Sequence, residues 1–163
     1  MSHVEGLIPK EFGADAIEVP GARNLLDSLE AVNARWAIVT SGTRALVSGW
    51  LDVMKLPNPK NLVVAEDVND GKPAPDCYLL GKDRLSLNAD AKVLVVEDAP
   101  AGIRAGKAAG CEVVALATTH KIQQLESAGA DWIIRDLRSL RHIGRDAETG
   151  DVKIQICNTW GKQ

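Results

Sequence analysis

The chain has 163 residues, 45% hydrophobic and 25% charged, a composition typical of a single soluble globular domain. Its formal net charge of −3 argues against a protein that binds a nucleic-acid backbone through a basic face. No apolar run approaches the length that spans a bilayer. We therefore expect neither nucleic acid nor a membrane as a partner, and no obligate protein partner is evident.

The cysteines and histidines show neither disulfide nor zinc-site spacing. They are scattered along the chain: Cys77, Cys111 and Cys157, and His3, His120 and His142. The odd number of cysteines favours reduced thiols, and the first six residues lack the basic and apolar regions of a secretory signal. These features predict a cytoplasmic protein.

Short β-branched runs alternate with amphipathic stretches of helical length, which is typical of an α/β protein with a parallel sheet. The pattern predicts strands at 36–39, 62–65, 92–96, 111–116 and 132–134. It predicts helices after 20–21, after 40–43, from 100 to about 110, and over 121–128. The tail at 146–157 is predicted to form a small hairpin around 148–151.

Three glycines recur at every fourth position of the predicted helix at 100–110. Gly102, Gly106 and Gly110 would therefore share one helical face. Because glycine has no side chain beyond hydrogen, we expect this face to pack closely on the sheet.

The first polar cluster, Thr40-Ser41-Gly42-Thr43, follows the first predicted strand directly. Small residues at a strand-to-helix turn can present main-chain N–H groups to an anion. Serine and threonine are also ordinary helix-capping residues, so the pattern by itself favours a cap.

The second cluster is the loop around Lys72, within Gly71-Lys72-Pro73-Ala74-Pro75-Asp76. Pro73 disfavours helical geometry at Lys72, and Pro75 stiffens the loop further. The loop could fix one positive charge beside a phosphate group, or Lys72 could be a surface lysine in a proline-rich turn.

The third cluster is Glu97-Asp98, directly after the most strand-like run of the sequence. Two adjacent carboxylates at the end of a buried strand favour a nearby cation. Magnesium takes oxygen ligands and often only one or two protein carboxylates. The alternative is that Asp98 caps the next helix while Glu97 is solvated.

These clusters, in this order, resemble the second, third and fourth motifs of the haloacid dehalogenase superfamily. The likeness is strongest to its fungal glycerol-phosphate and 2-deoxyglucose-6-phosphate phosphatases. The closer likeness is carried by 17–22, 36–43 and 97–110, and the likeness as a whole runs from about Val4 to Cys157, nearly the whole chain. The resemblance implies a Rossmann-like three-layer parallel sheet. It also implies a magnesium-dependent enzyme that removes phosphate from a small metabolite, glycerol phosphate or a sugar phosphate.

The resemblance also implies roles for individual residues. Thr40 would hydrogen-bond the phosphoryl group, and the Ser41-Gly42 turn would offer main-chain N–H groups. Lys72 would neutralise the charge of the phosphate. Asp98 would bind Mg²⁺, with Glu97 assisting directly or through water.

The nucleophile that the resemblance requires is absent from this chain. Relatives carry it in an Asp-x-Asp-Gly-Thr sequence at the end of the first strand, where one aspartate attacks phosphorus and the second transfers protons. No Asp-x-Asp precedes Thr40, and Asp15 lies in a polar stretch without a strand in front of it. We therefore expect an N-terminally truncated, inactive chain, with residues 1–16 as the remnant of a cap domain and 17–163 as an incomplete core.

By the same resemblance, the absent first strand would lie centrally, between the strands at 36–39 and 92–96. Unpaired N–H and C=O groups along both strands would each cost roughly 1–3 kcal/mol if buried. We therefore expect these strands to close together, or another segment or chain to fill the gap.

Two other functions remain open at this point. A non-catalytic protein could keep the Mg²⁺ and phosphate pocket and bind a phosphorylated ligand without turnover. A signalling receiver domain is suggested by the run before Glu97-Asp98, but the next strand end, at 116–119, offers no aspartate as phosphoacceptor.

Overall fold

The computed structural model describes residues 5–160, so His3 lies outside the described part. Helical segments are α2 (Ile8–Phe12), α3 (Ala22–Ala31), α4 (Arg44–Met54), α5 (Asp76–Arg84), α6 (Pro100–Ala108) and α7 (Ile122–Ser127). Strands are β1 (Ile38–Val39), β2 (Leu62–Val63), β3 (Leu94–Glu97), β4 (Glu112–Leu116), β5 (Trp132–Ile134), β6 (Leu140–Arg145) and β7 (Val152–Ile156). Three 3₁₀ turns complete the order: η1 (Gly13–Asp15), η2 (Ala65–Asp67) and η3 (Leu137–Ser139).

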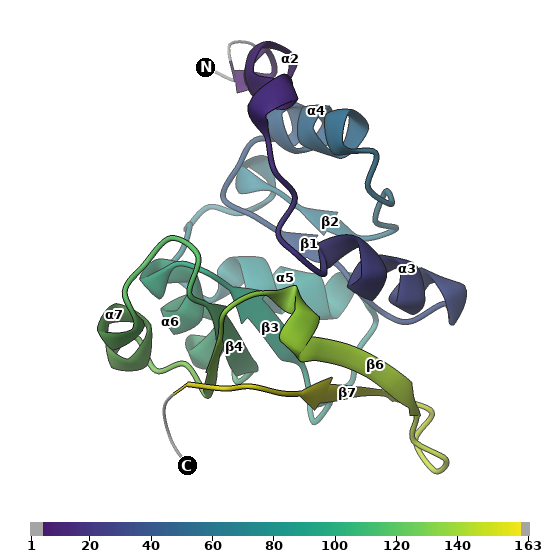
Figure 1. The fold of residues 1–163 in the computed structure, drawn as a ribbon. Coiled ribbons are helices and arrows are strands. Elements are labelled where there is room, and N and C mark those ends of the chain that lie inside the picture. Colours follow the sequence, from purple (N-terminus) through teal and green to yellow (C-terminus); the bar gives the residue numbers. More distant parts are fainter. Residues whose placement is uncertain (1–4, 161–163) are drawn as a thin grey trace.

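The parallel strands form two separate sheets rather than one. β1 pairs with β2, and β3, β4 and β5 form a three-stranded sheet in that order. β6 and β7 form an antiparallel hairpin that runs beneath α3 (Figure 1). Within residues 5–160 no strand joins β1 to β3, so these two strands have not closed together.

Both faces of the larger sheet are covered, which makes this an α/β fold with three layers. Alternate residues of β4 point to opposite faces. Val113 and Ala115 pack in a core shared with α5, α6 and α7, whereas Val114 and Leu116 pack in a second core beneath α3 and the hairpin. The predicted fold class is confirmed.

Most predicted elements occur, with corrections at their ends. The strands predicted at 36–39 and 62–65 shorten to two residues each, because each has only the other as a partner. The helix predicted to reach Gly110 ends at Ala108, and Gly110 has a φ of +73° just beyond it. Gly102 and Gly106 are buried in α6 as predicted, but Gly110 is a left-handed residue after the helix rather than part of its packing face.

A hairpin occurs and its turn lies at the predicted place, but its first strand is β6, at Leu140–Arg145, before the range predicted for the hairpin. The Asp146 carboxylate accepts main-chain N–H groups of Glu148 at 2.9 Å and Thr149 at 3.1 Å. These hydrogen bonds, together with Lys153, lower the pKa of Asp146 to about 2. The charged carboxylate therefore fixes the turn.

The helices of the described residues include none with the length and apolar character needed to cross a bilayer. Cys77 and Cys111 are buried, and burial raises the pKa of both thiols. Their reactive thiolate forms are therefore disfavoured.

Candidate functional site

The polar clusters singled out in the sequence converge at the carboxyl ends of β1 and β3. An open cleft of about 470 Å³ lies there, lined by Thr40, Ser41, Lys72, Glu97 and Asp98 among others. Ligands of open α/β sheets commonly bind at this edge. Strands from the two separate sheets therefore contribute to one site.

The loop after β1 is held by its own hydrogen bonds. The Thr40 N–H donates to Val63 O at 3.0 Å, and the Thr40 hydroxyl accepts the Gly42 N–H at 3.0 Å. Thr43 caps α4 by accepting the Leu46 N–H. Ser41 is exposed in the cleft, and neither its N–H nor its hydroxyl has a partner within residues 5–160. The capping interpretation thus applies to Thr43, and Ser41 is left available to a ligand.

Lys72 is a largely buried lysine rather than a surface one. Its side chain is 12% exposed and forms an ion pair with Glu97, whose side chain is 9% exposed. The ammonium group also donates to Val39 O at 3.3 Å and lies 5.0 Å from the centre of the Tyr78 ring. The positive charge is thereby fixed between the ends of β1 and β3.

Glu97 is fully engaged by the protein. Its Oε1 accepts Lys72 and the Tyr78 hydroxyl, the latter at 2.5 Å, and its Oε2 accepts the Asp98 N–H at 3.2 Å. Burial is the main cause that raises the pKa of Tyr78 far above its usual range, and the negative charge of Glu97 is the second. The phenol therefore stays protonated and donates its hydrogen bond to Glu97. A Cβ on Gly102 would lie 2.1 Å from the Glu97 carboxyl carbon, so only glycine makes room for this arrangement.

The loop that follows β4 contacts Asp98 and fixes its position. Its Oδ2 accepts the Thr119 hydroxyl at 2.8 Å, and its main-chain carbonyl lies 3.0 Å from His120 Nδ1. Oδ1 has no protein partner within the described residues. Asp98 does not cap α6, whose N-cap is Ala99 without a side-chain hydrogen bond. The capping alternative for Asp98 is therefore wrong.

The carboxylate oxygens at the cleft fit a hard cation, such as Mg²⁺, that is held by few protein ligands. Asp98 offers one carboxylate oxygen toward the cleft, whereas both Glu97 oxygens already accept hydrogen bonds. Magnesium keeps several waters and needs only one or two carboxylates. Residues 5–160 contain no cluster of three or more His, Cys, Asp or Glu side chains suited to a metal. Any cation here would thus depend on Asp98, water and a ligand phosphate.

The sequence pattern does not predict the residues that hold Glu97 and Asp98 in place, which are Tyr78, Thr119 and His120. Tyr78 lies on α5, a helix that the pattern did not predict, and Thr119 and His120 follow β4. The nearest signal in the sequence is the strand end at 116–119, because Thr119 is its last residue and His120 comes next. Asn69 and Asp76, which flank Lys72 in the loop, do not line the cleft.

A family model described as haloacid dehalogenase-like hydrolase matches residues 10–116, more than half of the chain. This chain belongs to the haloacid dehalogenase-like hydrolases. The assignment agrees with the motif order and removes the receiver-domain alternative, which rested on a single strand end.

Relatives with named activities support the same superfamily. The chain is 42% identical to glycerol-1-phosphate phosphohydrolase 1 of Saccharomyces cerevisiae over 161 residues, covering 94% of this chain and 64% of that protein. It is 36% identical to 2-deoxyglucose-6-phosphate phosphatase 1 of the same yeast, covering 86% of this chain and 63% of that protein. The resemblance to both groups is confirmed, and the chain spans less than two thirds of either relative.

Solved structures give the same fold. A hydrolase from Pseudomonas syringae matches with a TM-score of 0.73 and 31% identity, over 82% of this chain and 62% of that one. CbbY from Rhodobacter sphaeroides, solved in complex with phosphate, has a TM-score of 0.67 at 24% identity, over 78% of this chain and 58% of that one. The latter shows likeness of fold alone.

Proposed function

We propose that this haloacid dehalogenase-like chain carries the phosphate- and magnesium-binding part of a phosphatase for small phosphorylated metabolites. The convergence of Thr40, Lys72 and Asp98 on one cleft carries the proposal. The names of the yeast relatives point to glycerol phosphate or a sugar phosphate as the substrate class. A cytoplasmic location is part of the same proposal.

Ser41, Thr40 and Lys72 are proposed to bind the phosphate group. Ser41 would offer its free N–H and hydroxyl to phosphate oxygens, and the Thr40 hydroxyl could donate to the phosphoryl group while it accepts from Gly42. Lys72 would supply a fixed positive charge close to the phosphate. Because its ion pair with Glu97 is buried, this charge is positioned before a ligand arrives.

Asp98 would hold Mg²⁺ through the carboxylate oxygen that the protein leaves free. When bound, the ion would neutralise phosphate charge and favour attack at phosphorus. Thr119 fixes the other oxygen and so sets the direction of the carboxylate. Glu97 would act mainly as the counterion of Lys72, and any direct contact with the metal would require it to release hydrogen bonds.

Among residues 5–160, the proposed site offers no aspartate that could act as the nucleophile. Asp15 ends η1, beside α4, and is not among the residues of the cleft. Asp98, the proposed metal ligand, is the one aspartate that lines the cleft among residues 5–160. We therefore propose that the 163 residues alone bind phosphate without hydrolysing its esters. The division into a cap remnant at 1–16 and a core at 17–163 belongs to the same proposal.

A non-catalytic phosphate-binding protein is the second candidate. The Ser41 N–H and hydroxyl and the Asp98 Oδ1 have no protein partner among residues 5–160, and no second aspartate of those residues lines the cleft. Both observations favour this candidate for the 163 residues alone. Turnover by any longer form of the chain would favour the phosphatase.

Replacing Asp98 tests the proposed metal site directly. We expect wild-type chain to bind inorganic phosphate more tightly when Mg²⁺ is present, and Asp98→Asn to reduce the Mg²⁺-dependent part by about tenfold or more. Isothermal titration with phosphate, with and without Mg²⁺, measures both quantities.

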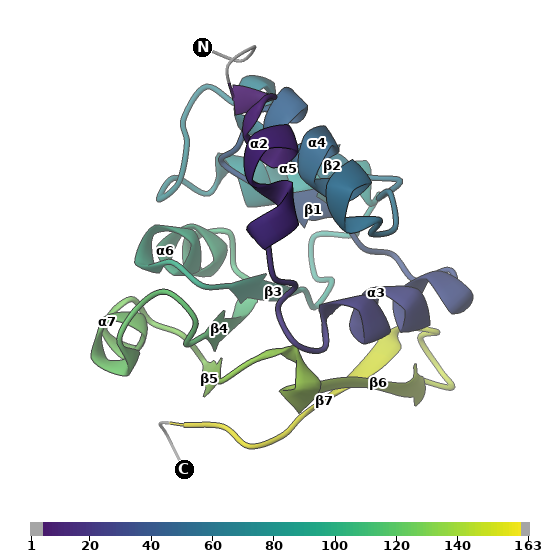
Figure 2. The same ribbon diagram turned by 45° about the horizontal axis from the view of Figure 1, so that its top comes forward.

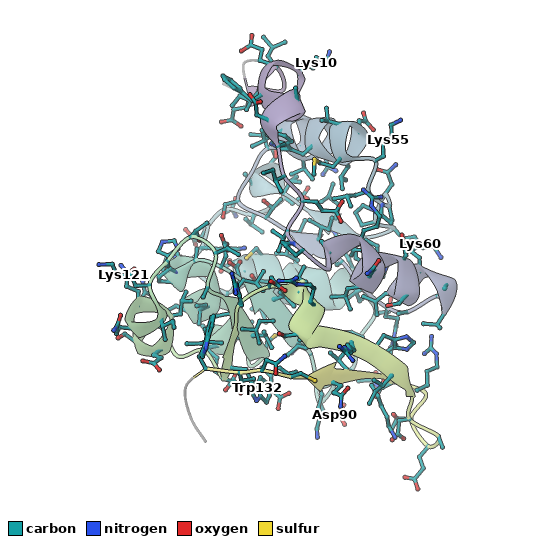
Figure 3. The ribbon with its side chains drawn as sticks, in the orientation of Figure 1. Lys10, Lys55, Lys60, Asp90, Lys121 and Trp132 are labelled. Carbon is teal, nitrogen blue, oxygen red and sulfur yellow. The ribbon has the colours of Figure 1, made fainter. Side chains whose placement is uncertain are left out.

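Asp90→Asn is the matched control, because Asp90 is an exposed residue of the same type (Figure 3). It precedes β3 in the chain, whereas Asp98 follows that strand. Asp90→Asn should bind like the wild type. Equal affinities with and without Mg²⁺, or an Asp98→Asn variant that keeps the full Mg²⁺ effect, would reject the proposed site.

A further inference from the structure

A short loop joins β4 to α7 (Figure 2). Because β4 pairs in parallel with β3, this loop begins beside the carboxyl end of β3, which Asp98 follows. The N–H of its first residue, Ala117, donates to Ile134 O at 2.9 Å. The N–H of its last residue, Lys121, donates to Gln124 Oε1 at 3.1 Å. The loop is therefore anchored at both ends by neighbouring elements.

The Thr119 hydroxyl of this loop lies among three polar atoms. Its oxygen is 2.8 Å from Asp98 Oδ2, 3.3 Å from the Asp98 main-chain O and 3.0 Å from His120 Nδ1. A hydroxyl has one hydrogen to donate, and the shortest of these contacts leads to the carboxylate. The Thr119 hydroxyl therefore donates to Oδ2, and its lone pairs remain free to accept.

The His120 ring fixes the hydroxyl in this role. Its Nδ1 lies 3.0 Å from the Asp98 main-chain O and 3.0 Å from the Thr119 hydroxyl oxygen. A carbonyl oxygen can only accept, and the hydroxyl hydrogen is already directed at Oδ2, so the hydrogen in both contacts belongs to Nδ1. The neutral Nδ1–H tautomer and the imidazolium both supply it. In either form the ring leaves the Thr119 hydrogen directed at Asp98.

Asp98 is consequently fixed through three of its atoms. Its N–H donates to Glu97 Oε2 at 3.2 Å, its main-chain O accepts from His120, and its Oδ2 accepts from Thr119. Oδ1 has no protein partner within the described residues. Because the main chain and one carboxylate oxygen are both held, the carboxylate cannot turn without breaking its bond to Thr119.

A carboxylate can hold a cation through one oxygen or through both. Coordination by both oxygens places the cation near each of them, so Asp98 would have to turn Oδ2 from Thr119 toward the cleft. Ca²⁺ takes about six to eight oxygen ligands in a flexible arrangement and accepts carboxylates in either mode. Mg²⁺ is smaller, requires an octahedron with shorter bonds and keeps several waters. Coordination through Oδ1 alone therefore suits Mg²⁺ better than Ca²⁺.

Other side chains at the cleft offer a larger cation little in return. Both Glu97 oxygens already accept hydrogen bonds, from Lys72 and Tyr78 at Oε1 and from the Asp98 N–H at Oε2. Across residues 5–160, no three His, Cys, Asp or Glu side chains come together as a metal site. Additional protein coordination would thus have to come from the second oxygen of Asp98.

We propose that Thr119 makes the Asp98 site selective for Mg²⁺ over Ca²⁺, by binding Oδ2 and so limiting the carboxylate to coordination through Oδ1. Thr119 is a positioning residue, because it acts on the cation through Asp98. The inference rests on the proposed metal site at Asp98 and goes beyond it by naming the residue that selects the ion.

Displacement of Mn²⁺ tests this selectivity without phosphate and without turnover. Electron paramagnetic resonance of free Mn²⁺ measures its binding to the full 163-residue chain, and titration with Mg²⁺ or Ca²⁺ gives the affinity of each competing ion. Only the binding that Asp98→Asn removes is assigned to the site. We expect the wild type to prefer Mg²⁺. Thr119→Val, which keeps the shape of the side chain and loses the hydroxyl, should lower the ratio of Mg²⁺ to Ca²⁺ affinity about tenfold.

Two further variants isolate the effect of the hydroxyl. Thr119→Ser keeps a hydroxyl and should preserve the affinity ratio to within about threefold. Thr118→Val makes the same change at the neighbouring exposed residue, whose hydroxyl has no hydrogen-bond partner within residues 5–160, and should leave the ratio unchanged. Urea unfolding midpoints close to that of the wild type would show that each variant is folded.

The outcomes distinguish the selectivity of Thr119 from the metal site on which it rests. If Asp98→Asn removes no Mn²⁺ binding, the proposed metal site is wrong and the selectivity falls with it. If the site binds Mn²⁺ but Thr119→Val keeps the wild-type ratio, or weakens Mg²⁺ and Ca²⁺ equally, the site stands and the role of Thr119 is overturned. A wild-type chain that prefers Ca²⁺ would overturn that role as well.

Discussion

Glu97→Ala is expected to lower the free energy of unfolding by about 3–5 kcal/mol, a large share of the roughly 5–15 kcal/mol typical of a domain. The reason is that Lys72 would keep a positive charge at 12% exposure without its carboxylate, and Tyr78 would lose the acceptor of its hydroxyl. Urea unfolding followed by circular dichroism measures the change.

Two variants separate the loss of the buried ion pair from the loss of a single hydrogen bond or of an exposed side chain. Tyr78→Phe removes only the hydroxyl bond to Glu97 and should cost about 1 kcal/mol. Glu126→Ala removes an exposed glutamate of α7 and should change stability by less than about 0.5 kcal/mol. If Glu97→Ala were no more destabilising than Tyr78→Phe, the buried ion pair would not hold the ends of β1 and β3 together.

Gly21→Ala is expected to cost about 3 kcal/mol or more, for two reasons that add. Gly21 has a φ of +91° at the N-cap of α3, a conformation that costs an L-residue about 1–3 kcal/mol. An added Cβ would also lie 2.4 Å from Arg138 N and 2.5 Å from Leu137 C, both main-chain atoms that cannot rotate away. The substitution should therefore displace α3 from η3 and the hairpin.

Gly71→Ala provides the matched control, because a Cβ there meets nothing within 4 Å and no positive φ is involved. It should leave the thermal midpoint nearly unchanged, while Gly21→Ala lowers it by several degrees. Similar midpoints for the two variants would contradict the close approach of α3 to η3.

The sequence was sufficient to predict which residues meet at the candidate cleft, because each follows a strand or lies beside a proline. Thr40, Ser41 and Asp98 come directly after β1 and β3, and Lys72 precedes Pro73. Parallel strands bring such positions to one edge, so their convergence was predictable from pattern alone. The burial of Lys72 could not be predicted from the pattern, because it depends on Glu97 and Tyr78, which come from other segments of the chain.

The parts that could not be predicted depend on tertiary contacts. The sequence pattern does not predict a helix over the nine residues of α5, because polar residues interrupt its apolar face and its buried side includes Gly81. Packing against α6 and the first sheet, rather than amphipathic pattern, therefore fixes this helix. Likewise, the family resemblance implied that β1 and β3 would either close together or be bridged by another segment or chain, and only the structure shows that a cavity lies between them.

The most direct test of the central claim is phosphate release from glycerol 3-phosphate by the purified 163-residue chain, with Mg²⁺ present. The account predicts no release above the buffer control, because no aspartate other than the proposed metal ligand Asp98 lines the cleft among residues 5–160. Release that Asp98→Ala abolishes would contradict it, since the 163 residues would then be sufficient for hydrolysis at this site.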